Sequence, residues 1–387
     1  MNILIYQSTV VAPDKGGISR MSKVLSDILA KHGHDVHYLS SDRKGRELLP
    51  GQLLLKGESL SEKHASFDET VNDYRIGLMI YQDGITPYNN HIIRWAKARG
   101  LKIIDVLHNS LRGMYGIEGH PSLSRICPRF MKGGINCLVN NFFKIKYGKL
   151  YREQFLLSDR IVLLSDKYRD EVGYFTGWHD FSKFTAIPNP LTLDRPGSIN
   201  TNKKKTVLNV ALLNHQKRHD LLLDVWKRVE EKRPDWSLQI VGDGPLRAKL
   251  SEQAKSLKLQ RMEFLGFQQP QPFYDEASIF CLTSGYEGFG LVLVEAMAYG
   301  CVPIAFDSWE LASDIIDHEV NGLLVRPFDV DAYAEKLIAL MDDRQAREEM
   351  AWKAEEKSHS FDIDRISVLW IHLLEELKHE KEYVHPC

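Results

Sequence analysis

Two acidic residues, Glu287 and Glu295, lie eight positions apart in the most informative stretch of the chain, residues 284–300. The stretch follows the apolar run 279–282, which is typical of a buried parallel strand, and enters a helical pattern at about Leu291. A strand, a glycine-rich loop and a helix N-terminus expose backbone N–H groups that bind phosphate. Carboxylates beside them can accept hydrogen bonds from sugar hydroxyls. The alternative is a solvated loop charge followed by a helix-face acid.

The spacing resembles the Glu-x7-Glu signature of the retaining nucleotide-sugar glycosyltransferases of family 4. The resemblance extends over nearly the whole chain and is dense over residues 207–327. It implies an α/β chain with the GT-B fold, in which two Rossmann-like, doubly wound domains face a central cleft. It also implies that Glu287 holds donor-sugar hydroxyls and Glu295 ribose hydroxyls. The backbone N–H groups of Phe289, Gly290 and Leu291 would meet the leaving diphosphate.

The composition is that of a soluble globular protein with two domains. The chain has 387 residues, 43% of them apolar and 26% charged, which is enough for two cores. Its net charge of −2 gives no global basic excess of the kind that favours nucleic acid. Five cysteines form no CxxC pair, and neither a signal peptide nor an apolar run of about 18 residues is apparent. We therefore expect a cytoplasmic protein, or one peripheral on the inner face of the membrane.

Short apolar runs alternate with helical patterns in both halves, which predicts parallel sheets covered by helices. Strands are expected at 3–6, 35–39, 76–80, 102–107, 160–164, 206–213, 237–241, 262–265, 279–282, 302–305 and 322–325. Helices are expected at 18–31, 90–99, 166–175, 220–231, 245–257, 291–299, 332–340, 344–357 and 363–381. A proline-containing linker at 187–190 separates an N-terminal acceptor-side domain, 1–190, from a nucleotide-sugar-binding domain, 191–360. By resemblance, the final segment, 361–387, crosses back to the first domain.

Three residues that follow expected strands of the first half are candidate site residues. Gly16 and Gly17 precede a helix, and glycine lets the backbone approach a phosphate or sugar closely. The resemblance places this pair against the donor diphosphate or the acceptor, whereas an ordinary turn is the alternative. His108 follows the strand 102–107. The resemblance implies a polar contact near the reacting centre, whereas a lone histidine at a strand end is otherwise structural.

The loop after the strand 206–213 matches the family pattern at one position and departs from it at two. Lys217 matches the lysine that holds the donor diphosphate. Leu212 stands where the family has an arginine, and Ala211 where it has a glycine. One cation that normally meets the leaving diphosphate is therefore missing, unless His215 or Arg218 substitutes for it. A solvated basic loop is the alternative.

Two further segments resemble donor-binding segments of the family. Residues 242–245, Gly-Asp-Gly-Pro, match a turn that helps to position the nucleotide, although any tight strand–helix turn can look like it. Gly266 and Phe267 fall where the family holds the nucleobase through backbone groups.

Two Asp-x-Asp sequences resemble the metal-binding signature of the other large glycosyltransferase fold. They are Asp329 with Asp331 and Asp362 with Asp364. Each pair precedes a helical pattern, where aspartate serves as an N-cap or first-turn acid. We therefore assign both pairs to helix capping and expect no metal ion.

The segment from Arg125 to Arg152 has no clear counterpart in the family. It contains seven basic residues and no Asp or Glu, interleaved with bulky apolar residues. This mixture is typical of a helix that lies on an anionic membrane surface. A solvated helix face with core residues is the alternative, and nucleic-acid binding has no supporting motif.

Together these residues predict a retaining, metal-independent hexosyltransferase with Glu287, Lys217 and His108 as its catalytic residues. The resemblance implies transfer of a hexose or N-acetylhexosamine from a nucleoside diphosphate sugar, expected to be UDP-linked, to a saccharide or lipid-linked saccharide. Cell-surface polysaccharide or glycolipid assembly is the expected setting, and no cofactor is expected. The alternatives are a non-catalytic nucleotide-sugar or membrane-binding module, and an epimerase or phosphorylase with the same fold. The Glu-x7-Glu spacing argues against the last two.

Overall fold

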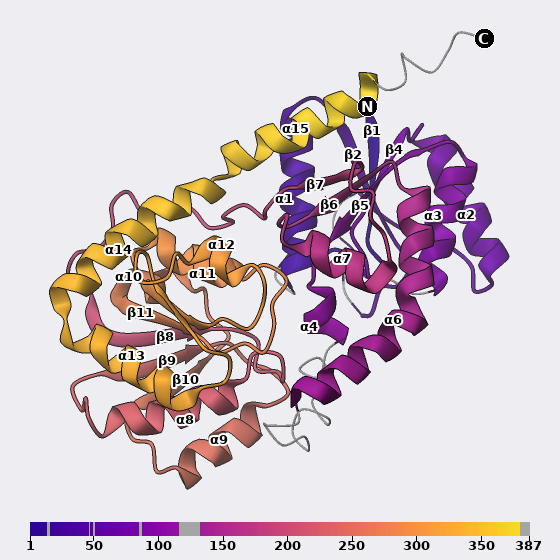
Figure 1. Ribbon diagram of the computed structural model, residues 1–387. Coiled ribbons are helices and arrows are strands. Elements are labelled where there is room, and N and C mark those ends of the chain that lie inside the picture. Colours follow the sequence, from indigo (N-terminus) through magenta and orange to yellow (C-terminus); the bar gives the residue numbers. More distant parts are fainter. Residues whose placement is uncertain (14–15, 46, 49–50, 85–86, 116–131, 380–387) are drawn as a thin grey trace. The chain divides into compact units, whose positions relative to one another are not determined.

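The computed structural model describes residues 1–13, 16–45, 47–48, 51–84, 87–115 and 132–379 (Figure 1). The chain divides into two compact units. Unit 1 comprises Met1–His108, Asn140–Asn189 and Ile363–Cys387, and unit 2 comprises Asn109–Val139 and Pro190–Asp362. Each unit is built around a parallel sheet of its own, which confirms the predicted fold class of two Rossmann-like units.

Unit 1 contains a seven-stranded sheet in the order β3-β2-β1-β4-β5-β6-β7. The strands are β1 (Asn2–Tyr6), β2 (Asp35–Ser40), β3 (Gln52–Leu54), β4 (Leu78–Tyr81), β5 (Lys102–Leu107), β6 (Arg160–Leu163) and β7 (Phe184–Ala186). The helices are α1 (Gly17–Lys31), α2 (Leu60–Asp73), α3 (Pro87–Ala98), α6 (Lys132–Leu157), α7 (Tyr168–Thr176) and α15 (Ile363–His379). The first turns of α6 belong to unit 2.

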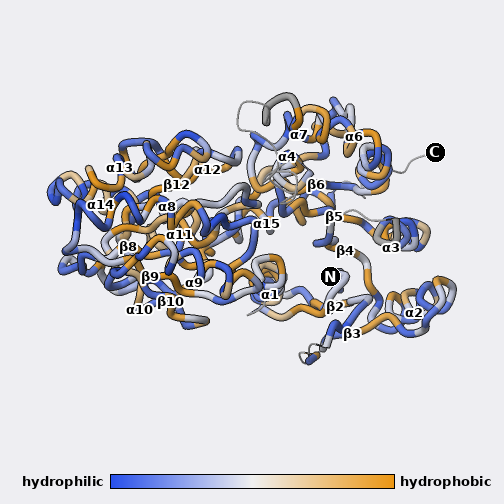
Figure 2. The backbone as a smooth tube through the Cα atoms, turned by 90° about the horizontal axis from the view of Figure 1, so that it is seen from below, coloured by the Kyte–Doolittle hydropathy of each residue, from blue (hydrophilic) through white to orange (hydrophobic). Residues whose placement is uncertain are grey.

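The central strands β1 and β4 of unit 1 consist almost entirely of buried apolar residues because helices cover both faces of the sheet (Figure 2). Alternate residues of β1 enter different cores, as the two-residue period of a strand requires. Ile3 and Ile5 pack with residues of α1 and α15, whereas Leu4 and Tyr6 pack with residues of α2 and α3. Helix α15 is therefore an integral part of the unit 1 core.

Unit 2 contains a six-stranded sheet in the order β10-β9-β8-β11-β12-β13. The strands are β8 (Lys204–Val210), β9 (Ser237–Val241), β10 (Met262–Gly266), β11 (Ala277–Leu282), β12 (Val302–Phe306) and β13 (Leu323–Val325). The helices are α4 (Leu111–Tyr115), α8 (His219–Glu230), α9 (Arg247–Ser256), α10 (Gln271–Glu276), α11 (Leu291–Ala298), α12 (Ala312–Ile315), α13 (Val330–Asp342), α14 (Arg344–Ser358) and the 3-10 turn η4 (His359–Phe361).

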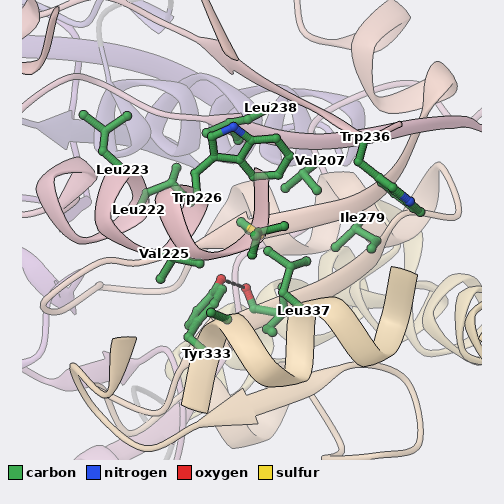
Figure 3. Packing of buried hydrophobic residues seen from close by; sticks show 14 of the residues in the cluster. Val207, Leu222, Leu223, Val225, Trp226, Trp236, Leu238, Ile279, Tyr333 and Leu337 are labelled. Carbon is green, nitrogen blue, oxygen red and sulfur yellow. Dashed lines mark hydrogen bonds between the residues drawn. The ribbon is translucent and has the colours of Figure 1, made fainter. Parts of the chain in front are cut away.

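One face of the unit 2 sheet is covered by α8 and α13, whose apolar residues meet strand residues (Figure 3). Trp226 of α8 and Tyr333 of α13 are fully buried there. The Tyr333 hydroxyl donates a hydrogen bond of 2.6 Å to the backbone carbonyl of Ile304 in β12, so the polar atom is paired inside the apolar core. The packing fixes α8, and with it the loop that enters α8 from β8.

Local side-chain signals explain where several elements begin. The Asp329 carboxylate accepts a hydrogen bond from the Ala332 N–H at the start of α13, which confirms the predicted cap. The Asp362 carboxylate, at the position before α15, forms an ion pair of 2.6 Å with Arg195, and its capping role stays a prediction. Helix α2, which the apolar pattern did not predict, begins with a capping box formed by Ser59 and Glu62.

Truncation of Leu373 on α15 tests the packing of the last helix in unit 1. Leu373 is buried in the same cluster as the β1 residues, so Leu373→Ala should lower the free energy of unfolding by about 2–5 kcal/mol. Leu369→Ala is the matched control, because Leu369 lies on the same helix and is exposed. Urea titration followed by circular dichroism measures both, and equal effects of the two substitutions would contradict the packing.

Candidate active site

The centre of the unit 2 sheet is a topological switch point. Strands β8 and β11 pair in the middle of the sheet, and successive strands are added outward on either side of them. Connections from two such strands leave toward opposite sides, which opens a crevice at their carboxyl ends where ligands bind in open α/β sheets. The loop after β8 carries Lys217, and the loop after β11 carries Glu287.

The structure brings Lys217 and Glu287 into direct contact. The Lys217 Nζ lies 2.6 Å from the Glu287 Oε1, and the Ser284 hydroxyl donates to the same oxygen at 2.6 Å. The Glu287 side chain is 7% exposed and that of Lys217 is 17% exposed. Because removing either charge from water is unfavourable, each depends on its partner in this position. A cation and a carboxylate that the sequence places 70 residues apart thus form one charged pair.

Hydrogen bonds between the two loops hold this pair in place. The Gly285 N–H donates to the Gln216 carbonyl at 2.7 Å, and the Gln216 side-chain amide donates to the Tyr286 carbonyl at 3.1 Å. The Thr283 hydroxyl donates to the Lys217 carbonyl at 3.2 Å. Sequence reasoning missed Gln216, Thr283 and Ser284. All three lie within four positions of Lys217 or Glu287, and this proximity in sequence could have identified them.

Helix α11 begins directly after the loop that carries Glu287. Gly290 precedes it with φ of 95°, a left-handed conformation that glycine adopts without strain. Phe289 is buried, and its ring packs against Phe361 with the ring centroids 5.5 Å apart. The first N–H groups of a helix lack intrahelical partners and carry the positive end of the helix dipole. The segment from Phe289 to Leu291 therefore offers a region that favours an anion close in sequence to Glu287.

Glu295 lies one turn into α11 and is 1% exposed. Its Oε1 accepts a hydrogen bond from the Thr192 hydroxyl at 3.2 Å, and its Oε2 accepts one from the Tyr274 hydroxyl at 3.0 Å. The carboxylate thus joins three parts of unit 2, namely the segment after residue 190, helix α10 and helix α11. Neither hydroxyl was identified from the sequence.

The loop after β8 also shows where this chain departs from the family pattern. Leu212, at the position of the family's arginine, is 56% exposed. Arg218 has a left-handed backbone and pairs with Asp220 at 3.1 Å, so its guanidinium is already engaged. Ala211 packs against Gly242, where an added Cβ would lie 2.0 Å from the Ala211 carbonyl oxygen. This close approach explains the glycine that begins the predicted Gly-Asp-Gly-Pro turn.

Gly266 and Phe267 lie at the end of β10, beside the turn that follows β9. The Gly242 N–H donates to the Gly266 carbonyl at 2.7 Å, which joins the two strand ends. Gly266 has φ of 72°, and the Phe267 side chain is 70% exposed. The predicted donor-binding segments therefore follow three adjacent strands, β8, β9 and β10.

The remaining predicted residues belong to unit 1. Gly16 caps α1 with φ of 149° and has open space where a Cβ would stand, and Gly17 is the first residue of the helix. His108 follows β5, and its Nε2 makes a hydrogen bond with the Gln82 side-chain amide, after β4. Burial lowers the pKa of His108 to about 4, so the ring is neutral near pH 7. Three residues earlier, within β5, burial raises the pKa of Asp105 to about 7.

Within the described residues, no group of three or more His, Cys, Asp or Glu side chains is arranged to hold a metal ion. Asp331 instead forms an ion pair of 2.5 Å with Arg228, from α13 to α8.

Two Rossmann-like units, each built on a parallel sheet, give this chain the fold of the GT-B class. Residues 193–357, which make up most of unit 2, match the family model of the glycosyl transferases group 1. The crystal structure of HepE from Anabaena in complex with UDP-glucose has the same fold, with a TM-score of 0.71, 18% identity and coverage of 98% of this chain and 100% of that one. Over residues 193–357 the chain is similar to the glycosyl transferases group 1, and its fold is that of the GT-B glycosyltransferases.

Curated relatives are similar over part of their length. An uncharacterized glycosyltransferase of Haemophilus influenzae is 31% identical over 217 residues, 55% of this chain and 60% of that protein. An alpha-1,4-N-acetyl-D-galactosaminyltransferase of Campylobacter jejuni, whose name specifies an undecaprenol-diphosphate-linked saccharide, is 26% identical over 232 residues, 59% of this chain and 58% of that protein. The chain thus spans about three fifths of the length of these two relatives.

The low pKa of His108 predicts that its imidazole stays neutral from pH 8 down to about pH 5. Because the pKa in the folded state lies below the ordinary 6.5, this ring contributes stability above pH 6.5 that is lost as the pH falls toward 4. Titration of the histidine ring signals by NMR, with His108→Gln to assign the resonance, should give a midpoint near 4. A midpoint at 6 or above would show that the ring is not desolvated.

Proposed function

We propose that this chain transfers a hexose or N-acetylhexosamine from a UDP-linked donor to a hydroxyl of a saccharide or lipid-linked saccharide, with retention at the anomeric carbon. The observation that carries the proposal is the Lys217–Glu287 pair at the switch point of unit 2. The family match over residues 193–357 supports the reaction class, and the UDP-glucose in the HepE structure supports the donor class.

Arrival of the donor exchanges the partners of the charged pair. A donor diphosphate carries more negative charge than one carboxylate, so it competes for the Lys217 ammonium. Glu287 then loses its cation and accepts hydrogen bonds from donor-sugar hydroxyls near the reacting carbon. The Ser284 hydroxyl, which donates to the Glu287 Oε1 at 2.6 Å in this structure, keeps the carboxylate oriented in this scheme.

Bond cleavage between the sugar and the diphosphate increases the negative charge on the departing oxygen. Lys217 and the N-terminus of α11 meet that charge without reorganisation, which is the most effective form of electrostatic stabilisation. The ring of His108 is neutral, so it can accept a hydrogen bond from a sugar hydroxyl or donate one to it without adding a charge to the site. Glu295 holds the ribose hydroxyls in this scheme.

The exposed Leu212 favours a second candidate function, a module that binds the nucleotide sugar without transferring it. With leucine at this position, the loop lacks one of the two cations that would contact the donor diphosphate. Hydrolysis of a radiolabelled donor in the absence of acceptor separates the two functions. The transferase should release free sugar slowly, whereas the module should release none and an epimerase should return an isomerised donor.

The proposed reaction takes place in the cytoplasm, and the proposed acceptor lies at the inner face of a membrane. The segment 125–152 is the proposed membrane contact, and residues 125–131 of it lie outside the described residues. The saccharide product belongs to the assembly of cell-surface polysaccharide or glycolipid in this proposal.

Substitutions at the charged pair test the proposed roles. Glu287→Ala and Lys217→Ala should each lower kcat by about 100-fold to 1000-fold, as loss of a transition-state contact does. Glu295→Ala should raise KM for the donor more than it lowers kcat, because ribose contacts are similar in the ground and transition states. Lys249→Ala, at an exposed position of α9, is the control. Steady-state kinetics with mild, equal effects at all three positions would reject the assignment.

The charge balance at the switch point predicts that transfer does not need a divalent cation. Lys217 and the α11 N-terminus supply the positive charge that a metal ion would otherwise supply. Activity should therefore be unchanged in excess EDTA. Loss of activity in EDTA, with recovery on addition of Mg²⁺ or Mn²⁺, would reject this mechanism.

A further inference from the structure

Helix α6 exposes an apolar stripe on the surface of unit 1. Phe142, Ile145 and Leu156 are 59%, 83% and 63% exposed. Together with Lys149 and Arg152 they follow the alternating three- and four-residue spacing that places side chains on one helix face. From residue 142 to residue 156 this face is about 21 Å long at 1.5 Å per residue. We call these five residues the outer face of α6.

The opposite face of α6 already supplies the contacts that hold the helix to unit 1. Tyr151 and Phe155 are buried, and the Gln154 amide donates a hydrogen bond of 2.7 Å to Asp105. Gly148 lies so close to α7 that an added Cβ would be 2.5 Å from the Phe175 carbonyl oxygen. The outer face is therefore not required for the core of unit 1, and its apolar residues need another explanation.

The charge along the outer face is mostly positive, and the one acid within its span, Glu153, is paired with Arg94 at 2.5 Å. No Asp or Glu occurs from Arg125 to Arg152. Lys149 and Arg152 lie among the exposed apolar residues, and Lys146 lies beside them with its Nζ 4.9 Å from the centre of the Tyr147 ring. Basic side chains with bulky apolar ones on one exposed helix face match the two components of an anionic lipid surface, its headgroups and its acyl boundary.

We propose that the outer face of α6 docks on an anionic lipid bilayer, with Phe142, Ile145 and Leu156 at the acyl boundary and the cations at the headgroups. The role of this contact rests on the proposed function: docking would bring a lipid-linked acceptor to the enzyme. A second copy of the chain fits less well, because pairing two outer faces would bring like charges together. Helix α6 lies along the surface, since no helix in the described ranges is long and apolar enough to cross a bilayer.

Co-sedimentation with vesicles tests the docking of the full chain. The vesicles are pure phosphatidylcholine and phosphatidylcholine with phosphatidylglycerol. Wild type should bind the anionic vesicles, and binding should weaken as salt rises because charge attraction is screened within about 10 Å. Lys146→Glu with Lys149→Glu should weaken binding at least about 25-fold, at roughly fivefold per cation near the surface. Phe142→Ala with Ile145→Ala should weaken binding even at low salt.

Matched controls separate the outer face from net charge and apolar content. Lys249→Glu with Lys255→Glu makes the same charge change on the exposed side of α9. Val368→Ala with Leu369→Ala truncates exposed apolar residues of α15. Both controls should bind vesicles like wild type. The proposal would be overturned if wild type did not bind anionic vesicles, or if the α6 variants bound them as well as wild type does. It would also be overturned if wild type formed a dimer that the α6 variants lose and bound no vesicles.

Activity toward a soluble acceptor keeps this inference separate from the proposed function. The α6 variants should retain wild-type turnover with a water-soluble saccharide acceptor and lose turnover with an acceptor embedded in anionic vesicles. A chain that binds vesicles through α6 but transfers no sugar would support the docking surface and reject the transferase.

Discussion

The site in unit 2 depends on one constraint, that two opposite charges are held together with little access to water. Neither the Lys217 ammonium nor the Glu287 carboxylate would be stable in that position alone, because burial of an unpaired charge is strongly unfavourable. Their pairing therefore requires the two loops to lie side by side, and the Gly285–Gln216 hydrogen bond keeps them there. The pair is stable without a donor and can be opened by a ligand that offers each partner a better contact.

The sheet topology satisfies this constraint. The strands β8 and β11 are neighbours in the sheet although about 70 residues separate their loops, and the helices that follow them leave in different directions. Burial of α8 and α13 against the sheet fixes the end of the first loop, while the left-handed Gly290 fixes the end of the second. The core of unit 2 thus fixes the backbone that carries Lys217, and only the lysine side chain itself remains free to move the ammonium.

The sequence was sufficient for the fold class, because alternating apolar runs and helical patterns indicate parallel sheets, and it named Lys217 and Glu287 as candidates without predicting their contact. Buried parallel strands are continuous apolar runs, so β5 and β9 were predicted with the bounds that the structure has. The short strands β3 and β7 and helix α2 were missed because three residues carry no period and the polar surface of α2 hides its apolar stripe. The hydrogen-bond partners of Glu295 could not be predicted from the sequence for a different reason. Thr192 and Tyr274 lie 103 and 21 residues away, and only the folded chain brings their hydroxyls to one carboxylate.

The affinity for UDP, which lacks the sugar, tests the exchange of partners most directly. Calorimetry on wild type, Glu287→Gln and Lys217→Met measures it without turnover. Since UDP must take Lys217 from Glu287, and a hydrogen bond to a charged acceptor exceeds one to a neutral acceptor by about 1.4 kcal/mol, Glu287→Gln should bind UDP about tenfold more tightly than wild type. Lys217→Met should bind UDP more weakly. Weaker UDP binding by Glu287→Gln as well would contradict the account, because it would mean that Glu287 supports the diphosphate site instead of competing for its cation.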